Sequence, residues 1–531
     1  MRNFKLATKT FLAASLALAS YGSFAAEPVK NVILMIGDGM GPGQMGLLEQ
    51  YASKAPHSIY NGRETAFKKM IDNGVLGMSL HSPADKLVVD SACSAAHLAS
   101  GIDAPSESVG IDMDGNHVDS VLEIAKRLGK ATGLVSDTRL THATPAAFAS
   151  HQPHRSLENK IAEEMLATGV DVMLSGGLRY FIPMSANDKK GNVYKQLVKQ
   201  TGGDIKIKSK RKDEKNLLTE AKDSGYSVVH TRDGLANAKG EQILGLFAYS
   251  GMADGITYSN SKDSKDRTQP SLKEMTMKAL DTLSQDPDGF FLMIEGGQID
   301  WAGHSNDAGT MLHEMLKFDE TIEYVYEWVK DRQDTLVVIT ADHETGGFGF
   351  SYSRSNPPKA EKRSGTAFKD RDYKPNFNFG ELEILDKLYN QKMSLGNMMA
   401  AYDKSDQKPE SLLKIVNDNS DFKITLAQAE RILEREKNTF QDADNTYLKA
   451  DTFPRVDDFE AFYVYGQDIR NDLIGRAMSQ DQNIVWGTGT HTATPVAAIA
   501  YGPDEVTAKF SALVHHTDIG QLLIETVKTG K

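Results

Sequence analysis

Nearly continuous apolar runs alternate along the chain with longer stretches in which apolar residues recur at helical spacing. The apolar runs are typical of strands buried on both faces of a parallel sheet, and they occupy residues 31–36, 131–136, 170–174, 290–294, 335–340 and 496–501. Helical spacing appears between them, at residues 119–128, 157–168, 271–284 and 308–329. This alternation predicts an α/β fold built on a doubly wound, mostly parallel sheet flanked by helices.

Reactive or metal-binding side chains follow several of these runs. They are Asp38, Thr144, Glu295, Asp342 and His343. Ligands of doubly wound sheets bind beyond the carboxyl ends of the strands. We therefore expect these five side chains to meet at one site.

The turn after the first run, residues 37–41 (GDGMG), has two interpretations. A glycine-rich turn after a first strand is typical of dinucleotide sites, but a carboxylate at its centre would repel a pyrophosphate. The same carboxylate attracts a cation. The composition of this turn therefore favours a metal site over a dinucleotide site.

The pattern changes between residues 351 and 480, where no buried-strand run is evident. A loop-like segment comes first, and helical patterns follow at residues 381–389, 395–402, 411–416, 426–436 and 459–478. We predict an α/β catalytic domain formed by residues 26–350 and 481–531. Residues 351–480 form a large, mainly helical insertion within it, as a lid or a dimer-interface region.

Two polar segments are interpreted as solvent-exposed. Residues 180–240 are polar and include the cationic run KIKSKRK at residues 206–212. We interpret this run as part of a solvated loop or hairpin rather than an anion-binding patch. The adjacent histidines at residues 515–516 are interpreted as a solvated pair near a helix start rather than an extra metal site.

The N-terminus has the features of a cleaved export signal. Three cationic residues precede a short apolar run at residues 11–19, and Ser23 and Ala25 suit the −3 and −1 positions of a cleavage site. We predict that residues 1–25 are a signal peptide and that the mature protein is periplasmic or secreted. Because no later run of about 18 apolar residues follows, we expect no membrane association.

Composition narrows the class of partner. The chain has 531 residues and a formal net charge of −12 at pH 7. This excess of negative charge argues against nucleic acid as a partner, and a phosphorylated substrate would need locally bound cations. The one cysteine, Cys93, excludes an intrachain disulfide and is interpreted as a small buried side chain.

Residues 88–101 predict an extended segment that turns into a helix of small residues. Ser91 stands near the predicted helix N-terminus, where unpaired N–H groups and the helix dipole attract anions. Taken alone, the stretch favours an N-cap role for Asp90 or Ser91. No Ser–His–acid arrangement is evident in the sequence, so a nucleophilic serine would require activation by a metal.

Two further motifs have the spacing of metal ligands. Asp300 and His304 are four residues apart and would share one face of a helical turn. The adjacent Asp342 and His343 offer a second oxygen–nitrogen pair. Mixed sets of aspartate and histidine suit zinc, whereas sets of oxygen ligands suit magnesium.

In combination, six motifs resemble those of the alkaline phosphatase family. They are GDGMG at residues 37–41, DSA at 90–92, HATP at 142–145, EGGQIDWAGH at 295–304, DHETGG at 342–347 and TGTHT at 488–492. The motifs follow the order of the family and span the chain from residue 31 to about residue 502.

The resemblance implies a covalent phosphoserine on Ser91 and clamping of the phosphate by Arg155. It also implies two zinc ions and one magnesium ion per subunit, and a homodimer. The implied ligands are Asp300, His304 and His491 for one zinc, Asp38, Asp342, His343 and Ser91 for the other, and Asp38, Glu295 and Thr144 for magnesium.

Two positions need separate interpretation. At His142 the family carries Asp or His, and we treat this residue as a neighbour of the magnesium site rather than a ligand. Trp301 stands where other members have Lys or His near the phosphate. An indole cannot contact phosphate as a cation, so a water network or weaker product binding would replace that contact.

The sequence therefore predicts hydrolysis of small phosphate monoesters at alkaline pH, where the serine and water that bind the metals are deprotonated. Two alternatives stay open. One is a phosphodiesterase or sulfatase of the same superfamily, although residues 90–95 lack the proline and arginine of the sulfatase C/S-x-P-x-R motif. The other is a secreted metal-binding protein without catalysis, in which Ser91 is incidental.

Overall fold

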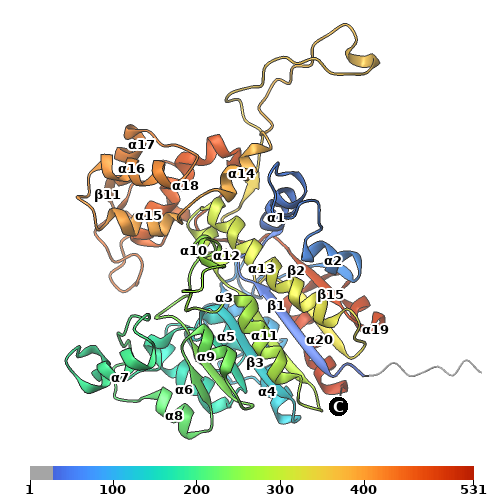
Figure 1. Cartoon of the computed structure of the whole chain (residues 1–531), viewed down its shortest axis with the longest axis vertical. Coiled ribbons are helices and arrows are strands. Elements are labelled where there is room, and N and C mark those ends of the chain that lie inside the picture. The colour runs from blue at the N-terminus through green and yellow to red at the C-terminus, as the bar shows by residue number, and fades with distance from the viewer. Residues whose placement is uncertain (1–27, 531) are drawn as a thin grey trace, which may run out of the picture.

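The computed structural model describes residues 28–530, so the predicted signal peptide lies outside the described residues. A ten-stranded sheet crosses the centre of the molecule (Figure 1). Its strands are β1 (Asn31–Gly37), β2 (Val75–Leu80), β3 (Ala131–Arg139), β4 (Val172–Gly176), β5 (Ser227–Val229), β6 (Ile243–Leu246), β7 (Phe290–Gly296), β8 (Thr335–Thr340), β15 (Val496–Tyr501) and β16 (Leu513–His515).

The strand order is β16-β2-β15-β8-β1-β7-β3-β4-β6-β5. Every neighbouring pair is parallel except the two pairs that involve β15, which runs antiparallel to β2 and to β8. The predicted fold class, a mostly parallel doubly wound sheet, is confirmed.

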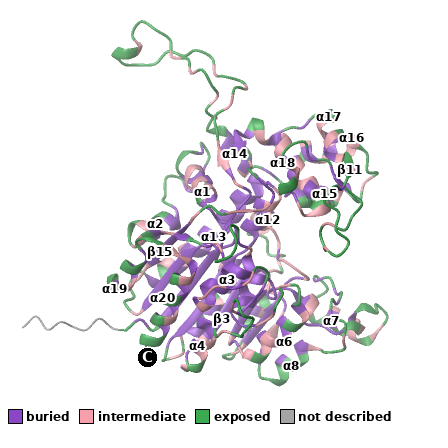
Figure 2. Cartoon of the chain, turned by 180° about the vertical axis from the view of Figure 1, so that it is seen from behind, coloured by how far each residue is buried: buried purple, intermediate pink, exposed green. Residues whose placement is uncertain are grey.

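Helices cover both faces of the sheet, as the purple buried layer in Figure 2 indicates. Alternate residues of β1 enter different cores: Ile33 and Met35 join one, and Val32 and Leu34 join the other. The first core is closed by α1 (Pro42–Lys54), α2 (Ala66–Asp72), α9 (Arg232–Asn237), α11 (Leu272–Leu283), α12 (Gln298–His304) and α13 (Ala308–Val329). The second is closed by α3 (Ser91–Ser100), α4 (Val121–Arg127), α5 (Ala143–Ala147), α6 (Glu158–Thr168), α7 (Asn192–Gln200), α8 (Leu217–Asp223) and α20 (His516–Thr529). Burial of β1 on both faces explains its continuous apolar run.

The polar stretch at residues 180–240 contains α7, α8, β5 and α9. The cationic run at residues 206–212 lies outside these elements and forms no helix or strand, as the loop interpretation predicts, but it is not wholly solvated. The Arg211 side chain is buried and forms ion pairs with Glu163 (2.6 Å) and Asp213 (2.7 Å). The expectation of a solvated run is therefore wrong at Arg211, since two carboxylates compensate its buried charge.

The histidine pair near the C-terminus also differs from expectation. His516 begins α20 and is fully buried rather than solvated. Its Nδ1 lies 2.6 Å from the Ser79 hydroxyl, and its Nε2 lies 3.1 Å from the carbonyl oxygen of Asp342. The ring is therefore held by hydrogen bonds inside the core.

Residues 351–480 leave and re-enter the α/β domain at neighbouring points. Two short antiparallel pairs join the ends of this segment, β9 (Glu344–Thr345) with β14 (His491–Thr492), and β10 (Gly349–Phe350) with β13 (Ile484–Val485). The first part, residues 351–380, projects from the body as an arm (Figure 1). Helices follow as α14 (Glu383–Tyr389), α15 (Leu395–Tyr402), α16 (Pro409–Asn419), α17 (Leu426–Leu433) and α18 (Ile469–Gln482).

The helix expected at residues 459–478 begins only at Ile469. Phe459 has a φ of 53°, in the left-handed region, and short 3₁₀ turns occupy Glu460–Phe462 and Gly466–Asp468. A non-glycine residue in the left-handed region does not continue an α-helix. Within residues 28–530, no helix combines the length and apolarity that crossing a membrane requires.

Candidate metal centre

Three adjacent parallel strands end at the same edge of the sheet and bring three carboxylates together. In β1, Ile36 pairs with Glu295 of β7 and with Thr340 of β8. Asp38 and Asp342 each lie just beyond the ends of β1 and β8. All three carboxylate side chains, Asp38, Glu295 and Asp342, are fully buried. The strand register therefore brings together the acids that the sequence places after these strands.

Ser91 is the first residue of α3, and Asp90 is the N-cap. The Asp90 carboxylate accepts hydrogen bonds from the N–H groups of Ala92 (3.0 Å) and Cys93 (3.3 Å). These bonds fix the turn that carries Ser91. The Ser91 hydroxyl is buried and lies 3.1 Å from Nε2 of His343. The serine thus faces the carboxylate cluster, and its neighbour supplies the cap.

One candidate cation site lies beside Ser91 and consists of Asp38, Asp342 and His343. A ligand atom from each residue lies within 4.8 Å of the other two. His343 Nε2 is 3.2 Å from Asp342 Oδ2 and 3.6 Å from Asp38 Oδ1. The Gly39 N–H donates to Asp342 Oδ1 and fixes the carboxylate (3.1 Å). The chain thus brings two carboxylates and one imidazole together next to the serine.

A second candidate site is built from Asp300, His304 and His491. Asp300 and His304 lie on α12, and the His304 Nε2 to Asp300 Oδ1 distance is 3.3 Å. His491 Nε2 is 3.6 Å from Asp300 Oδ1 and 3.2 Å from His304 Nε2. The predicted i, i+4 pair therefore does share a face and meets a third ligand from β14. His343 also belongs to a cluster with Asp300 and His491, so the first two sites adjoin.

The orientation of the two imidazoles indicates which of their nitrogens are free. His304 Nδ1 lies 2.7 Å from the carbonyl oxygen of Gly489, and His491 Nδ1 lies 2.9 Å from that of Val89. Because a carbonyl oxygen only accepts, each Nδ1 carries a proton, and Nε2 is the nitrogen left to bind a metal. An Nδ1 that donates to a carbonyl and an Nε2 directed into a cluster is the arrangement that metal-binding histidines adopt.

A third candidate site consists of Asp38, His142 and Glu295, whose ligand atoms all lie within 4.8 Å of one another. Thr144 lies on α5 and is also fully buried. Its hydroxyl is buried without a hydrogen bond. His142 is the N-cap residue of α5. The geometry thus places His142 close enough to be a ligand, whereas the sequence analysis treats it as a neighbour.

Several oxygens in these clusters are buried without a hydrogen bond. They are both carboxylate oxygens of Asp38, Oε1 of Glu295 and Oδ2 of Asp342. A buried polar atom without a partner is costly, so a compensating group is expected. Burial, together with repulsion between the acids, raises the pKa of Glu295 to about 7 and that of Asp342 to about 8. A bound cation would reverse these shifts and satisfy the free oxygens.

Two of the histidines are held in their neutral form, whereas at His304 burial is outweighed by the Asp300 carboxylate, which raises the pKa. Burial lowers the pKa of His491 to about 4 and that of His343 well below its usual value. Both rings are therefore neutral at pH 7, the form that binds metals. The mixed carboxylate and imidazole donors suit zinc at the site with His343 and at the site with His304 and His491. At the third site, where oxygen donors dominate, a harder cation is expected.

Arg155 is tied to the turn that precedes Ser91. Its Nη1 donates to Asp90 Oδ2 (2.9 Å), and its Nη2 lies 3.3 Å from Nε2 of His142. The Asp90 carboxylate thus holds both the helix start and the arginine. The sequence predicts only a capping role for Asp90, because its partner Arg155 is 65 positions away and leaves no local signal.

Trp301 and Tyr465 are aromatic side chains at the margin of the centre. The Trp301 ring lies edge-on to His142, with 6.0 Å between ring centroids, and packs closely on Gly251. The Tyr465 ring lies edge-on to His304, with 4.8 Å between centroids. The sequence gives no signal for Tyr465, because the apolar spacing of residues 459–478 predicts one helix of the insertion and not a segment that contacts the metal centre.

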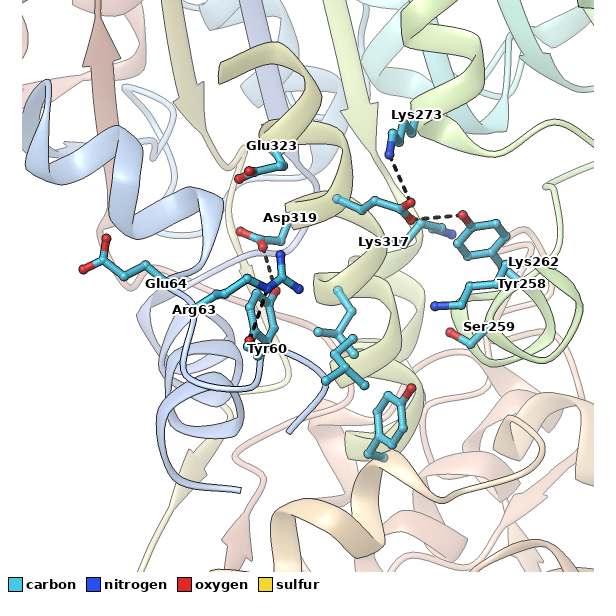
Figure 3. A pocket seen from close by; sticks show the side chains of 14 residues that line it. Tyr60, Arg63, Glu64, Tyr258, Ser259, Lys262, Lys273, Lys317, Asp319 and Glu323 are labelled. Atoms are coloured by element: carbon cyan, nitrogen blue, oxygen red, sulfur yellow. Dashed lines mark hydrogen bonds and ion pairs between the residues drawn. The ribbon is translucent and has the colours of Figure 1, made fainter. Parts of the chain in front are cut away.

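A separate cavity of about 300 Å³ lies between α13 and residues 59–64. Its polar side chains bind one another: Tyr60 donates to Asp319 (2.6 Å), and Lys273 pairs with Glu320 (3.4 Å) (Figure 3). None of the residues that line it belongs to the three candidate metal sites. The cavity and the metal centre are therefore different places in the molecule.

The family model for alkaline phosphatases matches residues 29–529. The chain belongs to the alkaline phosphatase family. Alkaline phosphatase 4 of Bacillus subtilis (strain 168) is 30% identical over 514 residues, which cover 95% of this chain and 90% of the relative. Alkaline phosphatase 3 of the same organism is 31% identical over 518 residues, which cover 94% and 90%. The chain is thus an enzyme of the phosphatase class.

Solved structures of alkaline phosphatases share the fold. The enzyme from Thermus thermophilus gives a TM-score of 0.70 at 25% identity, over 93% of this chain and 90% of that chain. The cold-active enzyme from Shewanella sp. gives a TM-score of 0.66 at 24% identity, over 94% and 99%. The similarity extends along nearly the whole chain, including the insertion.

Proposed function

We propose that this alkaline phosphatase hydrolyses phosphate monoesters through a covalent phosphoserine on Ser91, with two zinc ions and one magnesium ion per chain. The observation that carries the proposal is the position of Ser91. Its hydroxyl lies 3.1 Å from His343, within a cluster that shares Asp38 with one neighbouring cation site and His343 with the other. A metal held at this place would lower the pKa of the hydroxyl, so that it would lose its proton to water and attack the ester as an alkoxide.

The donor chemistry supports specific ligand sets. When bound, the metal ions would lower the pKa of the Ser91 hydroxyl and of water and would neutralise the developing charge on the phosphoryl group. The proposed ligands are Asp300, His304 and His491 for one zinc, Asp38, Asp342, His343 and Ser91 for the other, and Asp38, Glu295 and Thr144 for magnesium, with His142 beside it. The unpaired oxygens of Asp38 and Glu295 fit this assignment.

The side chains of the protein then act on the ester in a defined order. The Ser91 oxygen forms a bond to phosphorus while the bond from phosphorus to the alcohol oxygen breaks and the alcohol leaves. Arg155, oriented by Asp90, holds two phosphoryl oxygens with its planar guanidinium. Water afterwards attacks the phosphoserine and releases inorganic phosphate, which restores Ser91.

His343 is proposed as a ligand rather than as a general base for Ser91. Its Nε2 lies near oxygens of Asp38 and Asp342 as well as near Ser91, so it stands among several potential metal ligands. Its Nδ1 lies 3.2 Å from the Thr345 hydroxyl. The carboxylate that would orient a Ser–His–acid triad is therefore absent from that nitrogen, within the described residues.

Magnesium as the third ion draws support from a structural neighbour. Magnesium occupies the M3 site of a mutant of the alkaline phosphatase from the Antarctic bacterium TAB5, which gives a TM-score of 0.57 at 22% identity. In this chain the Asp38 and Glu295 oxygens offer the oxygen-rich environment that magnesium prefers.

Ser91→Ala tests the nucleophile. We expect the holoenzyme variant to lose at least about 1,000-fold in kcat on an aryl phosphate monoester, because the covalent step is removed. Elemental analysis serves as the control and should find magnesium and at least one zinc still bound. Hydrolysis by the variant at the wild-type rate would contradict the mechanism. Preferential cleavage of a phosphodiester or a sulfate ester by the wild-type enzyme would favour a phosphodiesterase or a sulfatase instead.

Location and assembly are part of the same proposal. The predicted signal peptide, residues 1–25, leads us to propose a periplasmic or secreted enzyme. We also propose a homodimer, with the arm at residues 351–380 as a contact. The arm exposes Tyr352, Phe377 and Phe379, and the Tyr352 ring packs against each of the two phenylalanine rings at centroid distances of 5.3 to 5.4 Å. Exposed aromatic clusters of this kind are typical of protein interfaces.

A further inference from the structure

The insertion reaches the metal centre through Tyr465. This side chain is half-buried, and its ring stands edge-on to His304 with 4.8 Å between centroids. A second insertion residue, Tyr447, packs edge-on against Tyr465 at 5.2 Å and is 53% exposed. The two rings thus form a wall that begins at a proposed metal ligand and extends outward to solvent.

The backbone before Tyr465 is anchored to the loop that orients the ligands. The Phe462 carbonyl accepts hydrogen bonds from the Thr488 hydroxyl (3.0 Å) and the Gly489 N–H (3.3 Å). Gly489 in turn accepts a hydrogen bond from His304 through its own carbonyl (2.7 Å). One loop therefore fixes both the imidazole and the segment that carries the tyrosine.

A buried neighbour secures the same segment. Tyr463 is buried, and its hydroxyl lies 3.4 Å from Asn306 Oδ1 and 2.5 Å from Nη1 of Arg476 on α18. Gly475 of α18 packs directly on the Asn306 backbone, just after α12. The helical part of the insertion accordingly lies beside α12 in both views (Figures 1 and 2). Tyr465 is thus held rigidly rather than carried on a free loop.

In-line displacement indicates which part of the substrate would lie beside Tyr465. The attacking and departing oxygens are on opposite sides of phosphorus. If Ser91 attacks from beside His343, as proposed, the departing oxygen would lie on the side of Asp300, His304 and His491. Tyr465 stands against that second site.

We propose that Tyr465, together with Tyr447, contacts the leaving group of the ester and gives the enzyme a preference for phosphate monoesters of flat, aromatic alcohols over those of aliphatic alcohols. This inference rests on the proposed function. An aromatic leaving group can stack on or meet the edge of these rings, whereas a small aliphatic alcohol offers little surface for such contact.

Two variants test the role of the ring. Tyr465→Ala should lower the ratio of kcat/KM for phenyl phosphate to that for glycerol phosphate by about 2- to 10-fold, the range for loss of one aromatic contact. Tyr465→Phe keeps the ring and should change the ratio less than about 2-fold. The matched control is Tyr194→Ala, which removes a partly buried tyrosine of α7, far from the centre in Figure 1, and should leave the ratio unchanged.

Binding without turnover gives a second readout. In the Ser91→Ala background, titration calorimetry with the metal-loaded protein should show that Tyr465→Ala weakens phenyl phosphate by the same factor and glycerol phosphate by less. Binding of inorganic phosphate, which has no leaving group, should stay unchanged. Elemental analysis should find the same metal content with and without the Tyr465→Ala change.

Three results would overturn the inference. They are an unchanged ratio in Tyr465→Ala, a parallel loss for both esters and for inorganic phosphate, and a reduced metal content that accounts for the loss. Failure of the proposed function would be seen differently, since the wild-type enzyme would then hydrolyse neither ester.

Discussion

Asp38 is the residue on which the centre depends most. It belongs to two of the three candidate cation sites, and both of its oxygens are buried without a hydrogen bond. Burial and the nearby acids Asp342, Asp300 and Glu295 raise its pKa well above the usual value. Without cations the burial of this carboxylate would cost stability, and its two unpartnered oxygens would be free to bind a cation in each of the two candidate sites.

Replacing Asp38 by Asn separates these two effects. We expect bound metal, measured by elemental analysis, to fall by at least one ion per chain, because the amide is a weaker ligand and carries no charge. In chelator, where the buried charge has no partner, the melting temperature of the variant should be equal to or higher than that of the wild type.

The control is Asp112→Asn, at an exposed turn that the centre does not include. It should leave metal content unchanged. A D38N enzyme with full metal content, or one that is strongly destabilised in chelator, would contradict the assignment of Asp38.

Single residues differ in how far the sequence reveals them. The acids after β1, β7 and β8 could be predicted, because parallel strands end at one edge and each acid follows its strand directly. The bond from Arg155 to Asp90 and the contact of Tyr465 with His304 could not. Both join distant segments through side-chain geometry that has no periodic signal.

At the scale of elements, capping explains how α11 begins. Ser271 is the N-cap and Glu274 completes a capping box, while Arg267 and Arg232 bind the same carboxylate. Burial alone would raise the pKa of Glu274, but the bonds to Arg267 and to the Ser271 N–H lower it to about 2. The carboxylate thus stabilises the helix start most when it is ionised.

This shift makes a pH prediction for Glu274→Gln. The folded pKa is about 2 and the ordinary value is 4.5, so the stabilisation is present above about pH 4.5 and is lost as the pH falls toward 2. Discounted for partial exposure, the loss at pH 7 should be about 1–2 kcal/mol. Thermal unfolding in chelator should show the deficit at pH 7 and a smaller one near pH 3. A deficit independent of pH would contradict the account.

Elements with two buried faces were the easiest to predict. The runs at residues 31–36 and 335–340 correspond to β1 and β8 in the middle of the sheet. Strands β5 and β16 lie at the two edges, are three residues long and are only partly buried, so they leave no apolar run. The first part of the helix predicted at residues 459–478 does not form, because a left-handed residue and 3₁₀ turns interrupt the segment although its apolar spacing is helical.

At the scale of the whole molecule, the arm is the feature with the least internal support. Isolated bridges pair Ser353 with Asn378 and Glu361 with Tyr373, and most of the arm is exposed (Figure 2). A projecting hairpin with exposed aromatic side chains gains stability when a second surface covers it. The proposed partner is a second copy of the chain.

Deleting residues 355–376 and joining the ends through two glycines tests the arm. The bridge between Ser353 and Asn378 lies outside the deletion, so the stem should persist. We expect light scattering to show a dimer for the wild type and mainly a monomer for the variant at micromolar concentration. Tyr352→Ser combined with Phe377→Ser should weaken the dimer without shortening the chain. A deletion variant that remains a dimer of unchanged affinity would contradict the proposal.

The central claim is that Ser91 carries the phosphoryl group during turnover. The most direct measurement is a rapid acid quench of the metal-loaded enzyme with an aryl phosphate, followed by mass spectrometry of the peptide that contains residues 88–101. We predict a single added phosphoryl group on Ser91, absent from the Ser91→Ala variant and from chelator-treated protein. Continued turnover with no phosphate on Ser91, or with the group on another residue, would contradict the account.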